Sequence, residues 1–236
     1  MASPIVHDAT TISAGTSGVS TLTVSHPVGN GTFRLLIVTA VSENTVTPAN
    51  TPISTLTYAG IAMSKVNNQS FSGGNENVEQ WYLLSPPVGT WDCIPTWVGT
   101  ADVGLIVSSY FNVAQTPPDA NAITTGTGLS FSASVTPLNN DSLIYSSLMD
   151  QSSSNTLTLD AGPTQRANTI FVGFWKEGAA ETLQSGAPAA VTHSWTSGAS
   201  QTYGMVITAY APITSVPIGA RYKPLRPRAF APGSAR

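Results

Sequence analysis

Charged residues are scarce in this sequence. They make up 9% of its 236 residues, whereas ordinary globular proteins hold roughly 25%. Serine, threonine, asparagine, glycine and alanine take their place, and 41% of the chain is hydrophobic. That hydrophobic share is spread along the whole chain, which excludes intrinsic disorder. A surface with few charges and many hydroxyl groups is typical of extracellular and virion proteins, so we expect one of these settings.

Cysteines and targeting segments are also lacking. Cys93 is the single cysteine, which excludes an internal disulfide framework. The first residues have neither the basic nor the apolar region of a signal peptide. No apolar run approaches about 18 residues, the length that spans a membrane as a helix. We therefore expect a protein that is made in the host cytoplasm, binds no membrane, and leaves the cell by lysis or as part of a particle.

Helical periodicity is absent as well, because glycine and proline interrupt the chain throughout. Apolar runs suited to strands follow one another instead. Phe33–Val41 and Val103–Val113 are so apolar that we expect both faces to be buried, and Tyr203–Tyr210 should lie centrally in a sheet. We count about twelve to fourteen short strands, a number typical of a sandwich or barrel. The predicted fold is all-β, an antiparallel β-sandwich of jelly-roll type.

Turn residues divide these strands. Ala59-Gly60 predicts a tight hairpin, whereas Asn67–Asn77, Gln115–Gly128 and Glu177–Pro188 are polar or rich in glycine and proline and predict loops. The stretch Val78–Gly99 contains two apolar runs around a Pro-Pro pair and a glycine, and it holds three of the five tryptophans. This pattern predicts a hairpin whose aromatic rings anchor the core or line a groove.

Residues that could carry chemistry are few and poorly spaced. His7, His26 and His193 lack metal-ligand spacing, and no Gly-x-Ser-x-Gly elbow occurs. Glu76 and Glu79 are close in sequence, but an odd spacing places them on opposite faces of a strand, so a solvated strand edge is the simpler interpretation. We therefore predict no catalytic residue, no metal and no cofactor. The chain is expected not to be an enzyme.

Calcium is the one metal that the sequence leaves open, through the aspartates that flank predicted loops, Asp141, Asp150 and Asp160. Carboxylate oxygens are the ligands that calcium prefers. No DxDxDG pattern accompanies them, so solvated loop residues are the favoured interpretation.

Charge is distributed unevenly along the chain. Residues 1–220 contain four basic and twelve acidic side chains, a net charge of −8, whereas residues 221–236 carry five basic side chains and no acidic one. Three prolines, Pro224, Pro227 and Pro232, lie within these last sixteen residues, and Pro217 precedes them. Proline fixes φ and removes backbone donors, which favours an extended segment. We predict a sandwich domain over residues 1–213 and an extended basic arm over residues 214–236.

The arm is the strongest candidate for a binding segment. Its candidate contact residues are the basic and the large apolar side chains: Arg221, Tyr222, Lys223, Leu225, Arg226, Arg228, Phe230 and Arg236. Five positive charges could meet nucleic-acid phosphates, but an acidic body argues against that partner. We expect the arm to dock on another copy of the chain or on another virion or surface protein.

The tryptophans support two interpretations. Aromatic side chains at the rim of a sandwich can stack on sugars, which makes Trp91, Trp97 and Trp175 candidates for glycan binding. Large aromatic residues are more often core or interface residues. The second interpretation is the one that we favour.

Several segments resemble motifs of a known domain: Phe33–Val38, Leu56–Gly60 with Ala62–Val66, Val78–Leu83 with Pro86-Pro87 and Gly89-Thr90, Val113–Pro117, and Ser194–Thr196. They are similar to the strands and turns of a jelly-roll-like β-sandwich domain that recurs in bacterial secreted and surface proteins and in structural proteins of tailed phages. Ala59, Gln80 and Asn112 depart from that pattern. The resemblance implies a fold over about residues 20–212 and brings no activity with it.

These observations lead to a functional hypothesis. The chain is expected to be a non-enzymatic virion component of a phage, in capsid decoration, a tail or a fibre, that contacts its neighbours through sheet edges and the arm. The alternative is a carbohydrate-binding or adhesive module at an extracellular surface.

Overall fold

The structure is a computed structural model that describes residues 3–13, 15–43, 53–151, 156–171 and 175–213. These residues form sixteen strands and one 3-10 turn, Ser72–Gly74, without an α-helix. The all-β prediction is therefore confirmed. No described segment forms a helix that is long and apolar enough to cross a membrane.

Three antiparallel sheets build the molecule. The central sheet has the order β1 (Val6–Ile12), β10 (Ala101–Phe111), β4 (Leu35–Glu43), β8 (Glu76–Leu84) and β7 (Ser64–Phe71), with β2 (Thr16–Val19) also on β10. The small sheet has the order β3 (Val24–Val28), β9 (Gly89–Thr96), β5 (Thr55–Tyr58) and β6 (Ile61–Ala62).

The outer sheet contains the longest strands. Its order is β11 (Ala120–Val135), β16 (Val191–Tyr210), β12 (Leu143–Asp150), β15 (Trp175–Leu183) and β14 (Thr164–Phe171), with β13 (Leu157–Leu159) on the first half of β16. β11 pairs with β16 along its full length, with a register shift between Gly128 and Ser130. β16 lies between β11 and β12, so the central position predicted for Tyr203–Tyr210 is confirmed.

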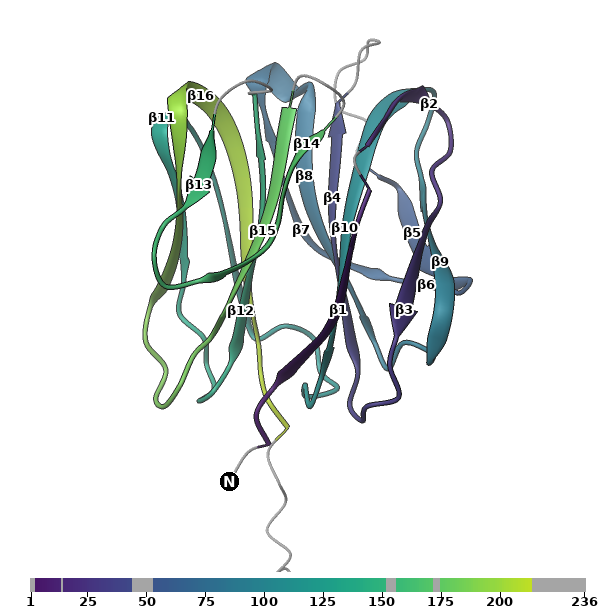
Figure 1. The fold of residues 1–236 in the computed structure, drawn as a ribbon, viewed down its shortest axis with the longest axis vertical. Coiled ribbons are helices and arrows are strands. Elements are labelled where there is room, and N and C mark those ends of the chain that lie inside the picture. Colours follow the sequence, from purple (N-terminus) through teal and green to yellow (C-terminus); the bar gives the residue numbers. More distant parts are fainter. Residues whose placement is uncertain (1–2, 14, 44–52, 152–155, 172–174, 214–236) are drawn as a thin grey trace, which may run out of the picture.

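The sheets stack as three layers, with the outer sheet on the left of Figure 1, the central sheet in the middle and the small sheet on the right. Alternate residues of β4 point to opposite sides of the central sheet. Leu36 and Val38 pack toward the small sheet, and Leu35 and Ile37 pack toward the outer sheet. The prediction that Phe33–Val41 is covered on both faces is therefore confirmed for Leu35–Val41. The sandwich prediction is confirmed, whereas a jelly-roll strand order is not.

The predicted hairpin at Val78–Gly99 is wrong. Its two runs become β8 and β9, which belong to different sheets and do not pair. The segment between them carries the chain from the central to the small sheet, and it includes Ser85 and Gly89 at positive φ. Turn residues mark a reversal of the chain but do not determine which strands pair. By contrast, the hairpin predicted at Ala59-Gly60 is confirmed, because β5 and β6 pair across these two residues.

Three predicted loops are also wrong in part. β7 continues to Phe71, β11 begins at Ala120, and β15 crosses most of the supposed loop Glu177–Pro188. In β15, polar and glycine residues are compatible with a strand because neighbouring strands cover them, whereas in the edge strands β7 and β11 most of them are half-buried or exposed. Gly178 illustrates this, since a Cβ atom there would lie 3.1 Å from the Trp195 ring. The close contact of backbone and indole explains a glycine in a buried strand.

Candidate functional site

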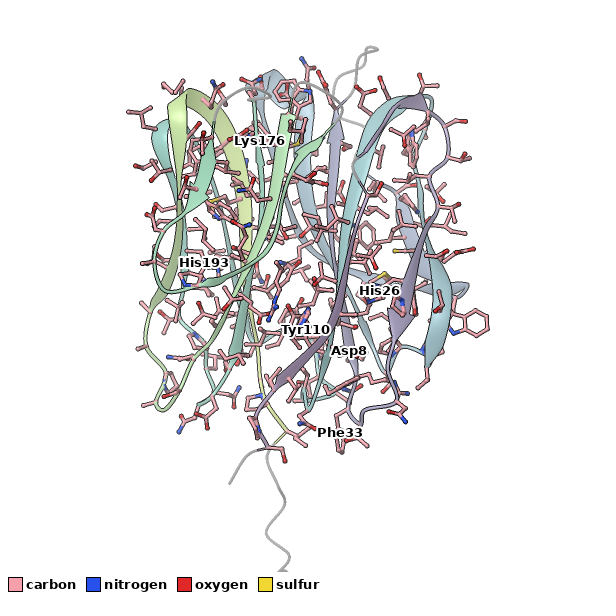
Figure 2. The ribbon with its side chains drawn as sticks, in the orientation of Figure 1. Asp8, His26, Phe33, Tyr110, Lys176 and His193 are labelled. Carbon is pink, nitrogen blue, oxygen red and sulfur yellow. The ribbon has the colours of Figure 1, made fainter. Side chains whose placement is uncertain are left out.

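An aspartate, a serine and a histidine meet between the central and small sheets (Figure 2 labels Asp8 and His26). Ser109 Oγ donates to Asp8 Oδ2 at 2.8 Å and lies 3.1 Å from His26 Nε2, while His26 Nδ1 lies 2.9 Å from Thr11 Oγ1. His26 and Ser109 are fully buried, and burial lowers the pKa of His26 to about 4. The serine hydrogen is committed to the aspartate, so the histidine has no proton to remove from it. The cluster links β1, β3 and β10 instead of forming a nucleophile.

The other histidines lie apart from this cluster. His193 is fully buried in the outer sheet, where its ring nitrogens lie 2.8 Å from Ser146 Oγ and 3.0 Å from Thr182 Oγ1. Burial lowers its pKa to about 4. His7 bonds Thr10 Oγ1 at 2.9 Å. Within the described part of the chain, no three His, Cys, Asp or Glu side chains are grouped to hold a metal ion.

The two neighbouring glutamates lie on opposite faces of β8, as their spacing predicts. Glu79 faces the small sheet and binds Lys65 Nζ at 2.7 Å, the Ile53 backbone amide at 2.8 Å and Trp81 Nε1 at 2.9 Å. Glu76 faces the outer sheet, where it accepts a hydrogen bond from Gln151. Both are buried, so the expectation of a solvated strand edge is wrong. Burial raises both pKa values, and for Glu79 the Lys65 ammonium opposes that effect.

A second ionic cluster joins the central and outer sheets near Tyr110, which Figure 2 labels at the centre of the molecule. Glu181 of β15 accepts one hydrogen bond from Tyr110 Oη and pairs with Arg166 of β14 through its other oxygen. The His7 ring packs edge-on against Tyr110, with 5.4 Å between the ring centroids. Because both Glu181 oxygens are engaged, this carboxylate is a structural acceptor and not an available base.

Glu177 is the most isolated ionisable group of the interior. It is fully buried on β15, and neither carboxyl oxygen has a hydrogen-bond partner among the described residues. Burial raises its pKa well above the ordinary value, because the low-dielectric interior disfavours the charged form. Its sequence position lies in a predicted loop, so the sequence contained no signal for this burial.

The aspartates considered for calcium have separate roles. Asp141 accepts a hydrogen bond from the Gly186 backbone amide at 2.8 Å, and Asp160 accepts one from Thr196 Oγ1 at 3.1 Å. Asp150 is buried in β12. They do not converge on one site in the described part of the molecule.

The three candidate tryptophans do not form one surface. Trp97 is buried in the core between the central and small sheets and donates to the Val19 carbonyl at 3.2 Å. Trp175 is half-buried and donates to Glu43. Trp91 is 48% exposed, close to the exposed side chain of Val88. Only one of the three rings therefore offers a substantial open face.

The chain leaves the described fold beside its own beginning, at the lower end of Figure 1. Val113 and Pro212 form a β-bridge, the Ile213 amide donates to the Asn112 carbonyl at 3.0 Å, and the Asn112 side chain donates to the Pro4 carbonyl. A surface pocket of about 330 Å³ lies at the same end, lined by Pro4, Ile5, Asp141, Leu183, Gln184 and Ser185. The candidate arm residues lie outside the described residues.

The described body holds all twelve acidic side chains of the chain and four of its nine basic ones. Two of these four cations, Lys65 and Arg166, form ion pairs with buried glutamates. Arg34 donates to the backbone carbonyls of Gly31 and Pro86. Asp92, Asp141 and Asp160 are exposed. The surface of the body therefore carries an excess of negative charge.

An open sheet edge lies where the sequence predicts a connecting loop, because the first half of β11 falls within Gln115–Gly128. β11 pairs with β16 alone among the described strands. Its exposed positions alternate with half-buried ones from Asn121 to Leu129, and Ile123 is 45% and Leu129 54% exposed. Ile123 and the threonines of Ala120–Leu129 favour a strand and could have identified β11, but not its position at the edge.

No family model, curated protein or solved structure matches this chain. The resemblance to phage and surface domains therefore stays a prediction.

Proposed function

We propose that this protein is a non-enzymatic structural protein that joins other copies of itself, or other proteins of a particle, through its basic arm and its sheet edges. A phage virion is the setting that we infer, as part of a capsid decoration, a tail or a fibre. The observation that carries the proposal is the separation of charge between an acidic body and an arm with five cations in sixteen residues. Opposite charges on two copies favour association and direct its orientation.

The interior of the body supports a structural role. The Asp8–Ser109–His26 cluster and the Tyr110–Glu181–Arg166 cluster each combine residue types used in catalysis. In both clusters the polar atoms that could act as acid, base or nucleophile are bound to other protein groups. Hydrogen-bonded networks of this kind fix the packing of layers.

A carbohydrate-binding function is the second candidate, and the half-exposed Trp91 favours it. An indole with an open face can stack on a sugar ring. Glycan-array binding that is lost in Trp91→Ala, and kept in Trp97→Phe, would support this candidate over assembly.

The charge of the arm provides the test of the assembly proposal. In the full chain, Arg221→Gln, Lys223→Gln, Arg226→Gln and Arg228→Gln together remove four positive charges. We expect light scattering to detect a loss of higher assemblies, and salt to have the same effect on the unaltered chain, because exposed charge pairs are screened. Lys176→Gln in the body is the control and should assemble normally. Unchanged assembly of the arm variant would reject the proposal.

A further inference from the structure

We propose that the outer edge of β11 pairs with β11 of a second copy, antiparallel about a two-fold axis, so that two outer sheets become one continuous sheet. This inference rests on the proposed assembly function and names the edge that serves it. β11 lies at the left margin of the molecule in Figure 1, and no described strand pairs with its outer side. An open strand edge presents a row of unpaired amide and carbonyl groups that can pair with another strand.

The other sheet edges are blunted in ways that prevent such pairing. β1, β7 and β14 each combine a register shift with a charged residue, namely Asp8, Lys65 and Arg166. The remaining edge strands are short: β2 has four residues, β3 has five and includes Pro27, β6 has two, and β13 has three. Short length, charge, proline and bulges are the features by which proteins protect edges.

β11 lacks most of this protection. It is sixteen residues long and contains no charged residue and no proline. It does have a register shift between Gly128 and Ser130, which divides the edge into two parts. Beyond this shift, Phe131, Ala133 and Val135 point into the core of the outer sheet, while Ser130, Ser132 and Ser134 are exposed. In the first part, Asn67 of β7 donates to the Asn121 side chain at 2.9 Å, whereas no described strand other than β16 pairs with the backbone of β11 in either part.

A second copy of β11 is the occupant that the chemistry favours. Two copies of β11 have the same length, so they can pair along all of it. A two-fold interface uses the same surface of both copies, so no second binding surface is needed. Because β11 is uncharged, the two copies place no like charges opposite each other. The basic arm is a poorer partner for this edge, since Pro217, Pro224, Pro227 and Pro232 lack the amide hydrogens that a new strand would donate.

Lysine substitutions on the full chain test the proposal. Ile123→Lys with Ser132→Lys places one charge in each part of the strand, at exposed positions. Sedimentation equilibrium should detect a dimer of the unaltered chain and an increase of about tenfold or more in the Kd of the variant, since lysines of the two copies would repel each other. Gln165→Lys, on the exposed side of the opposite edge strand β14, should leave the Kd unchanged. A Kd equal in all three proteins, or an unaltered chain that stays monomeric, would overturn the proposal.

A cysteine scan provides the geometric test. Cys93 is buried and its pKa is raised to about 12 by burial, so it does not compete for oxidation. Single cysteines at Thr125, Thr127, Leu129 and Ser132 should cross-link only near the two-fold axis, where the Cα atoms come within about 7 Å. Equal cross-linking at all four positions and at Gln165, or none at any, would contradict paired β11 strands.

Salt separates this proposal from the proposed function of the arm. Pairing of uncharged strands should give a dimer whose Kd does not rise with salt, because salt screens only the repulsion between the two acidic bodies, whereas arm contacts should weaken as salt rises. A salt-resistant dimer that the β11 lysines disrupt supports the edge even if the arm variant assembles normally. Assembly that only salt and the arm variant disrupt would reject the edge and keep the arm.

Discussion

The two faces of the central sheet are buried in different ways. Toward the small sheet, one apolar cluster extends across the interface and includes Leu36, Val38, Leu105 and Trp81. Toward the outer sheet, the apolar contacts form two separate clusters. Polar side chains lie in this second interface: Thr39, Gln80, Ser108, Tyr145, Ser147 and Thr208.

This difference shows that neighbouring residues of one strand are stabilised by different effects. In β4, Val38 contributes to stability through close packing, so a smaller side chain there would lower the free energy of unfolding. Thr39, on the opposite face, shares a hydrogen bond of 2.6 Å with Ser147 in the outer sheet. Buried polar groups contribute little net stability when paired, but they cost more when a partner is removed. At these two positions the first interface should therefore respond to volume and the second to hydrogen-bond pairing. The first interface also contains polar groups elsewhere, namely the Asp8–Ser109–His26 cluster and Glu79.

The largest expected effect is that of a cavity on the apolar face. Leu105 is fully buried in the cluster between the central and small sheets. We expect Leu105→Ala to lower the free energy of unfolding by about 2–5 kcal/mol, because the removed atoms leave a space that rigid strands do not fill. Urea unfolding, with the midpoint compared at an unchanged slope, measures this cost. A cost close to zero would mean that this interface is loosely packed.

A smaller effect is expected when the polar face loses one partner. Gln80 accepts from Thr208 Oγ1 and donates to Ser147 Oγ at 3.1 Å. Gln80→Met keeps the approximate volume but leaves these hydroxyl groups short of a partner, at a cost of about 1–3 kcal/mol in unfolding free energy.

The control variant also removes the hydroxyl groups of Thr39, Ser147 and Thr208, which bond Gln80 or one another. Combining Gln80→Met with Thr39→Val, Ser147→Ala and Thr208→Val leaves no unpaired hydroxyl among these four residues, so urea unfolding should recover most of the loss. If each added substitution instead lowers the unfolding free energy further, hydrogen-bond pairing is not what stabilises this face.

The contrast between the faces also explains what the sequence could predict. The run Phe33–Val41 predicts burial on both sides because almost every residue is apolar. The structure confirms this for Leu35–Val41, whereas Phe33 is 48% exposed. The turn at Ala59-Gly60 depends on local geometry alone and is also correct. Periodicity reports how much of a strand is buried, but it does not identify the sheet that buries it. This is why β8 and β9 were assigned to one hairpin although they lie in different layers.

The buried acids of β15 are the clearest failure of prediction. Glu177 and Glu181 suggested an exposed loop, yet both are buried. Glu181 is compatible with burial because Tyr110 lies opposite it, a residue 71 positions earlier in the chain. Such long-range partners leave no local trace in a sequence. The same limitation applies to the candidate assembly edge, since only the completed sheet determines that β11 is its last strand.

Glu177 yields the smallest and most specific prediction for the polar face. Its pKa is raised by burial in the folded chain, whereas the pKa of a glutamate in an unfolded chain is about 4.3. Between these two pKa values the unfolded chain releases a proton that the folded chain keeps. Stability is therefore highest below the unfolded pKa and falls as pH rises, by up to about 1.4 kcal/mol per pH unit.

The measurement needs a window in which other groups do not obscure this slope. His26 and His193 have folded pKa values lowered to about 4, so they give the opposite slope between that pH and about 6.5. Above pH 7 both histidines are neutral in either state. Above the titration range of the histidines, Glu177→Gln should become more stable relative to the unaltered chain as pH rises towards the raised folded pKa of Glu177, because glutamine keeps the shape and does not titrate. The other raised carboxyls, including Glu76 and Glu79, are common to both proteins and cancel in the difference. Parallel pH curves for the two proteins would mean that Glu177 finds a proton donor or water in the folded state, and that this part of the polar face is not closed.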